Sequence, residues 1–264
     1  MKKNTNELFY QVVALLLSVI IVHTVYVTVV RPNAESQVRR AAEVAAAGEQ
    51  YVVPRSFFVV IKDFEQEACF VLAFWALAIM GFKARMTMRE QAMLDMPLVS
   101  ISEGTRILPD DAGQLSRPLQ SLPEEQQGYL LPRALRTALT RFQVTSSVQS
   151  ATEAVNNVCE TEDNRLDSEL SMVRYITWAI PSIGFIGTVR GIGAALGQAH
   201  EAMEGNIAGV TASLGVAFNS TFIALLISMV VMFFIHQLQL NQERLVLDTY
   251  SYCENRLLRF LKAE

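Results

Sequence analysis

The feature that most limits the fold is the stretch from Trp178 to His236, which consists largely of two long apolar runs. Hydroxyls, glycines and one amide are spaced along both runs, and no Asp or Glu lies between Gly205 and Gln242. In hydrocarbon a polar side chain is costly unless it contacts protein or a water-filled path. Four side chains are therefore expected to face inward, as in one wall of an ion pathway: Thr188, Asn219, Ser220 and Thr221.

The composition favours a membrane protein. Hydrophobic residues make up 51% of the 264 residues, and they are concentrated in blocks. A net charge of -4 is too weak to suggest a nucleic-acid partner or a polybasic arm for the membrane surface. The three cysteines have no C-x-x-C spacing, which argues against a disulfide framework or a zinc site. We expect small buried or cytoplasmic thiols at Cys69, Cys159 and Cys253.

Four apolar runs predict an all-α integral membrane protein with four transmembrane helices and long cytoplasmic helical extensions. The predicted spans are Leu8 to Val30, Ala68 to Phe82, Ile176 to Leu196 and Gly209 to His236. The first is followed by Arg31-Pro32-Asn33 rather than by a small-residue cleavage site, so we interpret it as an uncleaved span. The second is short, and extension back towards Phe57 or local bilayer thinning would have to complete it.

Basic residues near the span ends predict that both termini are cytoplasmic. The residues that support this orientation are Lys2, Lys3, Lys83, Arg85, Arg89, Arg174 and Arg244. Those that argue against it are Arg31, Arg39, Arg40, Arg55 and Lys62. The predicted divisions are an N-terminal transmembrane helix (1–30), a periplasmic segment (31–63), a second transmembrane helix (64–84), a cytoplasmic helical domain (85–172), paired pore-forming helices (173–236) and a cytoplasmic C-terminal helix (237–264).

Helical periodicity extends outside the spans. Ala34 to Gln50 predicts a short outer helix that ends near Gly48, after which Pro54 restarts the chain. Apolar residues recur from Arg133 to Val173 without proline or glycine, which predicts one helix continuing into the third span. A second rod from Gln237 to Leu261 should pack against it. The acidic run Glu160 to Asp163 is interpreted as a solvated face.

Glycines spaced four apart in the third span allow a neighbouring backbone to approach closely. Thr188 shares a helical stripe with Gly184, Gly191 and Ala195, so packing alone does not explain it. In the fourth span small residues follow one another at steps of three to four: Gly209, Ser213, Ala217, Thr221, Ala224 and Ser228. The alternative is that these hydroxyls only bond to carbonyls of their own helix. Another face carries Phe222, Leu226, Met229 and Phe233, which suit lipid or partner helices.

These two spans resemble the paired pore helices of the MotA/TolQ/ExbB proton-channel family. Gly187-Thr188-Val189 stands at the family's Gly-Thr-Val motif, and Ala217-Phe218-Asn219-Ser220-Thr221 at its hydroxyl-bearing motif. The match covers roughly the last third of the chain. It is closer to a TolQ/ExbB-like branch with an extra N-terminal span, because rotor-contacting charges like those of MotA have no match in the segment from Lys83 to Met172.

The resemblance implies a homopentamer in a bacterial inner membrane around a dimer of a single-span partner similar to ExbD, TolR or MotB. The partner would carry a membrane Asp, and Thr188 and Thr221 would line the ion route, with Ser220 and Asn219 beside them. Small residues would pack the pore helices: Gly184, Gly187, Gly191, Ser213 and Ala217. The transported ion would be H+ or Na+, and its flow would turn a rotary motor. No other cofactor is expected.

Two positions depart from the family pattern. Val216 stands where TolQ and ExbB proteins usually have a glutamate, and Arg190 where they often have a tryptophan. Arg190 is a candidate outer-end gate or anchor; we expect it to snorkel to head groups or to pair with Glu201 or Glu204. The three histidines are scattered one per region, so no metal cluster is predicted: His23, His200 and His236.

The leading hypothesis is thus the ion-conducting stator-type subunit of a motor driven by proton, or sodium, motive force. The alternative is a membrane scaffold or signalling protein whose polar spans only pack and pass no ions. A transporter with its own substrate site is disfavoured because no inverted repeat is visible. No Walker, G-x-S-x-G, H-E-x-x-H or EF-hand motif occurs, so an enzyme is not predicted.

Overall fold

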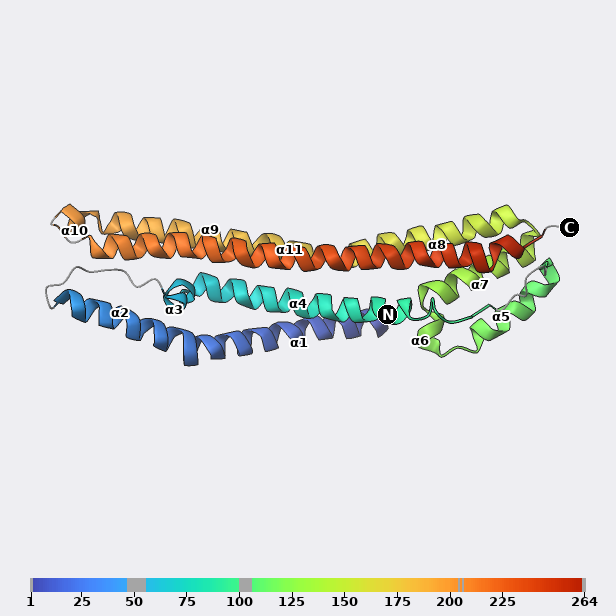
Figure 1. Cartoon of the computed structure of the whole chain (residues 1–264), viewed down its shortest axis with the longest axis horizontal. Helices are drawn as coiled ribbons and strands as arrows, with labels where there is room; N and C mark the ends of the chain where they lie inside the picture. Colours follow the sequence, from blue (N-terminus) through green and yellow to red (C-terminus); the bar gives the residue numbers. More distant parts are fainter. Residues whose placement is uncertain (1, 47–55, 100–105, 204, 206, 263–264) are drawn as a thin grey trace. The chain divides into compact units, whose positions relative to one another are not determined.

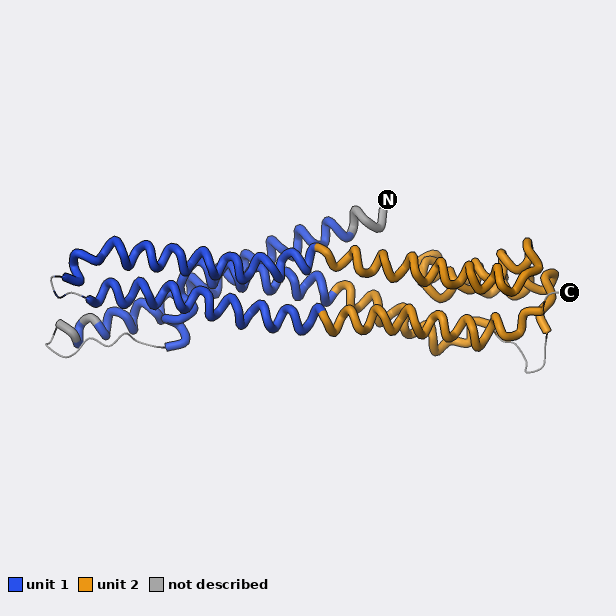
Figure 2. Tube along the Cα trace, turned by 90° about the horizontal axis from the view of Figure 1, so that it is seen from above, with its two compact units in different colours: residues 1–81, 172–235 blue, residues 82–171, 236–264 orange. Residues whose placement is uncertain are grey.

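The computed structural model describes residues 2–46, 56–99, 106–203, 205 and 207–262. Within these ranges the regular structure is helical, apart from one isolated parallel bridge between Ile107 and Leu261 (Figure 1). Internal contacts divide the chain into two compact units (Figure 2). Unit 1 comprises Met1–Gly81 and Met172–Ile235, and unit 2 comprises Phe82–Ser171 and His236–Glu264.

The helical elements follow one another along the chain. They are α1 (Lys2–Val25), a π-helical stretch (Tyr26–Val30), α2 (Arg31–Ala46), α3 (Phe57–Ile61), α4 (Phe64–Gln91), a 3-10 turn (Pro109–Asp111), α5 (Ala112–Gln120), α6 (Glu124–Gln127), α7 (Leu130–Thr145), α8 (Val148–Glu169), α9 (Ser171–Gly197), α10 (Ala199–Met203), α11 (Ala208–Arg256) and a final 3-10 turn (Leu258–Phe260).

In unit 1, the helix does not end after Val30 as the sequence suggested. It continues through the π-helical stretch into α2, and the axes of α1 and α2 meet at an angle there (Figure 1). Pro32 explains the wider turn, because proline has no N–H to bond the carbonyl four residues back and its ring crowds that carbonyl. The outer helix is therefore Arg31–Ala46; Gly48 and Pro54 lie outside the described residues.

The weak second span is longer than its apolar core. Helix α4 begins at Phe64 and has 28 residues, a length of about 42 Å. The expected extension towards Phe57 is a separate helix, α3, capped by Ser56, whose side chain accepts from the N–H of Val59. Helix α4 lies antiparallel to α1: Trp75 Nε1 donates to the carbonyl of Gln11 at 2.9 Å, and the Tyr10 hydroxyl to that of Ala78 at 3.2 Å.

Unit 2 corrects the prediction of one unbroken helix from Arg133 to Val173. Ser146 has φ of 48°, in the left-handed region that single residues use to end a helix. The side chain of Ser147 then caps α8 by accepting from the N–H of Ser150. Helix α7 therefore folds back on α8, and the two share a buried apolar cluster with the end of α11. The cluster includes Leu135, Leu139, Phe142, Val155, Cys159, Cys253 and Leu257.

We had expected the acidic run at Glu160 to Asp163 to be a solvated face, but one of its residues is buried. The Glu162 side chain is only 3% exposed and pairs with Arg133 at 2.5 Å and with Arg165 at 3.2 Å. The cause is the fold-back at Ser146, which brings α7 over this face of α8. In the same unit the buried ammonium of Lys83 lies 2.6 Å from Glu169. Burial of these charges is tolerated because each has an oppositely charged partner.

Candidate functional site

Helices α9 and α11 lie in backbone contact along a stripe of small residues. A Cβ built on Gly191 would lie 2.6 Å from the Ala217 nitrogen and 2.8 Å from the Ser213 carbonyl oxygen, and one on Gly184 would lie 3.0 Å from the Ser220 carbonyl oxygen. Real Cβ atoms do not approach other atoms so closely, so a larger residue at Gly191 would push the helices apart. Glycine therefore sets the spacing of α9 and α11.

The hydroxyls of Thr188 and Thr221 meet inside this contact and hydrogen-bond each other. Thr221 also reaches across to the carbonyl of Gly184 at 3.1 Å, and Thr188 to that of Ala217 at 3.0 Å. Thr188 lies 3.4 Å from the Gly184 carbonyl of its own helix. For these two residues the hydrogen bonds run between α9 and α11. Bonding only to carbonyls of the same helix, the alternative considered above, does not describe them.

This geometry gives the pair two hydrogen-bonded arrangements, since each hydroxyl has one proton and can also accept. In the first, Thr188 donates to Thr221, which donates to the Gly184 carbonyl. In the second, Thr221 donates to Thr188, which donates to the Ala217 carbonyl. Exchange between the two arrangements reverses the direction of the hydrogen bonds, which is the reorientation step of a proton relay; a relay also needs a group that delivers the proton and one that takes it away.

The other predicted pathway residues are not brought onto this pair. Ser220 is buried, but its hydroxyl donates to the carbonyl of Val216 in its own helix at 2.7 Å. Asn219 lies two positions before Thr221, about 200° round the helix, and is half-buried. The structure thus gathers Thr188, Thr221 and the small residues into one contact, with Ser220 against Gly187, whereas Asn219 lies on another face of α11.

Arg190 pairs with a residue that the sequence did not indicate. Its Nε and Nη2 atoms donate to the two carboxylate oxygens of Glu65, at 2.6 and 2.8 Å. The expected partner Glu201 lies eleven residues along the chain, about 16 Å further if the helix were continued; Glu204 lies outside the described residues. Arg190 therefore pairs with Glu65 and not with the expected Glu201, and its snorkelling to head groups stays a prediction. The sequence signal that could have indicated this partner is Glu65 itself, an acid just before the apolar run of the second span.

A second acid of α4 is held in a similar way. Glu67 lies 2.7 Å from Nδ1 of His23 and 2.5 Å from Nη2 of Arg31. His23 is thus a partner of a buried carboxylate in unit 1. Three polar atoms around these acids are buried without a hydrogen-bond partner: the Tyr26 hydroxyl, Asp63 Oδ2 and Gln66 Oε1. The start of α4 is the most polar part of the unit's interior.

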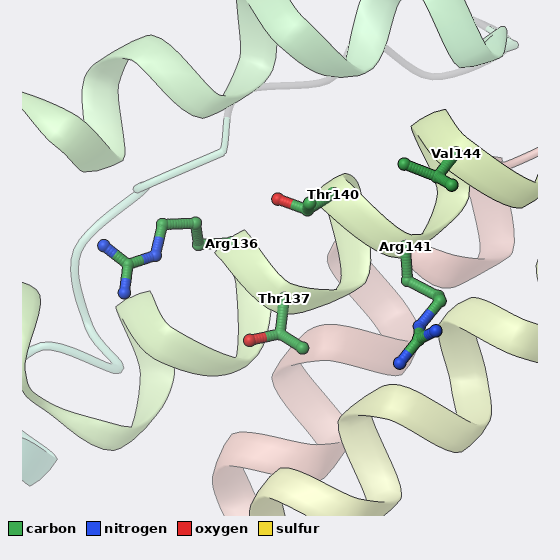
Figure 3. A pocket seen from close by; sticks show the side chains of 5 residues that line it. All are labelled: Arg136, Thr137, Thr140, Arg141 and Val144. Carbon is green, nitrogen blue, oxygen red and sulfur yellow. The ribbon is translucent and has the colours of Figure 1, made fainter.

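Two surface hollows offer no competing site. One of about 300 Å³ is lined by a single helix, α7, and its two arginines leave the helix in different directions (Figure 3); the lining is Arg136, Thr137, Thr140, Arg141 and Val144. The other, of about 330 Å³, lies between α4 and α11 and is apolar, with Phe70, Phe74 and Val230 among its lining residues. In the described residues no group of three His, Cys, Asp or Glu could hold a metal ion.

Comparison with known proteins places this geometry in context. Residues 126–250 match the model of the MotA/TolQ/ExbB proton channel family, a range that holds both threonines and the α9–α11 contact. No curated protein and no solved structure matches the chain. Four helical stretches are long and apolar enough to cross a membrane: Glu7–Ala41, Phe64–Gln91, Val148–Gly197 and Ala208–Phe260. The chain is therefore a multi-pass membrane protein whose residues 126–250 belong to the MotA/TolQ/ExbB proton channel family.

Proposed function

We propose that this chain is the ion-conducting, stator-type subunit of a rotary motor driven by proton motive force. The observation that carries the proposal is the hydrogen-bonded pair of Thr188 and Thr221 between two helices of the family segment. A hydroxyl pair with two arrangements can pass a proton along a path that is otherwise apolar. Coordination of Na+ would need several more oxygens, which favours H+ as the ion.

The pore helices supply no free carboxylate. Helix α11 has no acid from Ala208 to Gln242, and Glu65, which contacts α9 at this level, is already paired with Arg190. The acid that titrates during transport is therefore supplied by a partner. We propose a single-span protein similar to ExbD, TolR or MotB, with a membrane Asp, present as a dimer inside a pentamer of this chain.

The exposed apolar residues of unit 1 fit a ring of subunits in lipid. Large side chains on the face of α11 away from Thr221 are exposed, namely Phe222, Leu226, Met229 and Phe233. In this arrangement they would contact lipid or neighbouring subunits. We place the assembly in the inner membrane of a bacterium with both chain ends in the cytoplasm, following the distribution of basic residues around the spans.

The test is proton flux into proteoliposomes that contain the chain and its single-span companion. Thr221→Val keeps the shape of the side chain and removes the hydroxyl, so flux per assembled complex should fall by about ten-fold or more, the effect expected from one lost buried hydrogen-bonding group. Thr221→Ser, which keeps the hydroxyl, should retain most of the flux.

Thr211→Val is the matched control. Thr211 is exposed and its hydroxyl donates to the carbonyl of Ile207 in its own helix at 2.9 Å, so its loss should leave flux unchanged. Normal flux in assembled Thr221→Val complexes would exclude the proposed path. A stable complex that passes no ions even with both threonines present would favour a scaffold or signalling protein instead.

A further inference from the structure

Glu65 reaches the α9–α11 contact from a third helix. A Cβ built on Gly187 would lie 2.5 Å from Oγ of Ser220 in α11 and 3.1 Å from Cγ of Glu65 in α4. The absent side chain of Gly187 therefore leaves the space in which these two polar side chains come together. Gly187 immediately precedes Thr188 and Ser220 immediately precedes Thr221, so Glu65 lies beside the residues that adjoin both members of the hydroxyl pair.

The ion pair that holds Glu65 is asymmetric. The Glu65 side chain is 5% exposed, whereas that of Arg190 is 55% exposed. Arg190 lies three positions after Gly187, less than one helical turn away. The carboxylate is thus shielded between helices, and the guanidinium that neutralises it can be reached from outside the unit.

Packing alone does not account for this pair. A carboxylate taken out of water pays a large desolvation cost that an ion pair only partly offsets, and neutral residues of similar volume are often as stable. The same place could hold a glutamine without any charge. An ionisable pair kept inside an apolar region marks a functional site more often than a brace.

We propose that Glu65 is the fixed charge that sets cation flux past Thr188 and Thr221, and that Arg190 limits that flux by neutralising it. This proposal rests on the proposed function, because it assigns a charge to the same path. A carboxylate near the path attracts a cation and a guanidinium repels it, and both effects are strong where the effective dielectric constant is low. The two members of the pair therefore act with opposite sign.

The opposite signs make the proposal testable with single variants in the proteoliposome assay with the companion. Arg190→Gln leaves Glu65 unbalanced and should raise proton flux per complex about ten-fold, whereas Glu65→Gln leaves Arg190 unbalanced and should lower it about ten-fold. The double variant is neutral and should lie within about two-fold of the unchanged chain. Arg31→Gln is the matched control, since it breaks an ion pair to the neighbouring acid Glu67.

A second design keeps the site neutral during assembly. The chain with Glu65→Gln and Arg190→Cys is assembled first and then treated with a cationic or an anionic methanethiosulfonate. The exposure of position 190 admits the reagent, and the native cysteines are buried. The cationic reagent should lower flux and the anionic reagent should raise it.

Two results would overturn the proposal. In the first, Glu65→Gln and Arg190→Gln change flux in the same direction, or neither changes it. In the second, the two reagents have equal effects. Either would make the pair a structural brace while the threonine path stands, provided that Thr221→Val still lowers flux about ten-fold or more. Absence of any flux that depends on Thr221 would instead count against the proposed function, on which this inference rests.

Discussion

The two units of the chain differ in the residues that join their long helices. In unit 1 the interior contact of α9 and α11 consists of glycine, alanine, serine and threonine, and large apolar residues such as Phe185 and Phe222 are exposed. In unit 2 large apolar residues such as Phe142 and Leu135 are fully buried. Unit 1 is thus built for surroundings that are themselves apolar, where close backbone packing replaces the hydrophobic effect. Unit 2 has large apolar residues in its interior, as water-soluble proteins do.

The units also use ion pairs differently. In unit 2, Glu162 of α8 pairs with Arg133 of α7 and with Arg165 of its own helix, so the acid both joins two helices and is held within one. In unit 1, the Glu65–Arg190 pair lies beside a hydroxyl pair that contributes little apolar contact. Ion pairs join helices in both units, but only the Glu65–Arg190 pair lies beside a contact of small, hydroxyl-bearing residues, which is why it is the one proposed to act on ion flux.

The largest expected effect tests whether unit 2 depends on burial of large side chains. Phe142→Ala removes a fully buried ring and should destabilise the α7–α8 pair by about 3–5 kcal/mol. Hydrogen exchange of the α7 and α8 amides measures this loss. Val144→Ala on the same helix is the control, because Val144 is exposed and its truncation should cost less than about 0.5 kcal/mol. Equal effects of the two variants would contradict the claim that unit 2 is stabilised by burial of large apolar side chains.

Unit 1 should respond to added volume instead. Gly191→Ala inserts a methyl group against the backbone of α11 and should destabilise the α9–α11 contact by about 1–3 kcal/mol. Gly193→Ala is the control two positions along, where a Cβ would meet nothing within 4 Å; it should be neutral or slightly stabilising, since alanine favours helix. Thermal stability of the purified complex in detergent compares the two. A harmless Gly191→Ala would show that the helices are not held by close contact.

The ion pairs of unit 2 predict a smaller effect. Glu162→Gln leaves Arg133 and Arg165 without their shared acid, and it should destabilise α8 by about 1–2 kcal/mol, given that both arginines are partly exposed. Asp163→Asn changes the adjacent, exposed acid and should have almost no effect. Hydrogen exchange again provides the measurement. If both variants behave alike, the whole acidic run is a solvated face after all.

The smallest expected effect concerns the thiols of unit 2. Burial raises the pKa of the Cys159 thiol to about 11 and that of Cys253 to about 12, from an ordinary value of 9.0. The folded state therefore holds more protons than the unfolded state above pH 9, and the free energy of unfolding should fall as pH rises through this window. At pH 8, alkylation in the folded chain should be slower than in denaturant by about 100-fold at Cys159 and by about 1,000-fold at Cys253. Similar rates in both states would show that this core opens readily.

Much of the architecture could be predicted from the sequence because it follows from periodicity. Apolar runs of the length of a bilayer predicted the spans, and small residues at steps of four predicted which faces of α9 and α11 would approach. The two threonines stood out because hydroxyls are unusual in such runs, and they do lie in contact; their role in conduction stays a prediction, as does the assignment of segments to membrane or cytoplasm.

The features that were missed depend on tertiary contacts. The break at Ser146 carries no proline or glycine, so no local signal announced a left-handed residue. The burial of Glu162 follows from that break, and the partner of Arg190 is 125 positions away in the chain. Charged residues are usually exposed, so the sequence alone favoured solvent or a nearby partner for each of them.

The central claim is that the face of α11 with Thr221 lines an ion path and the face with Phe222 does not. The most direct test is to place a cysteine at each position, Thr221→Cys or Phe222→Cys, in the assembled complex and to expose it to Ag+, a thiol-reactive cation. Protection of the new thiol from later alkylation, read by mass spectrometry, reports access. The account predicts that the cysteine at 221 reacts and that the one at 222 does not; reaction at 222 alone would contradict it.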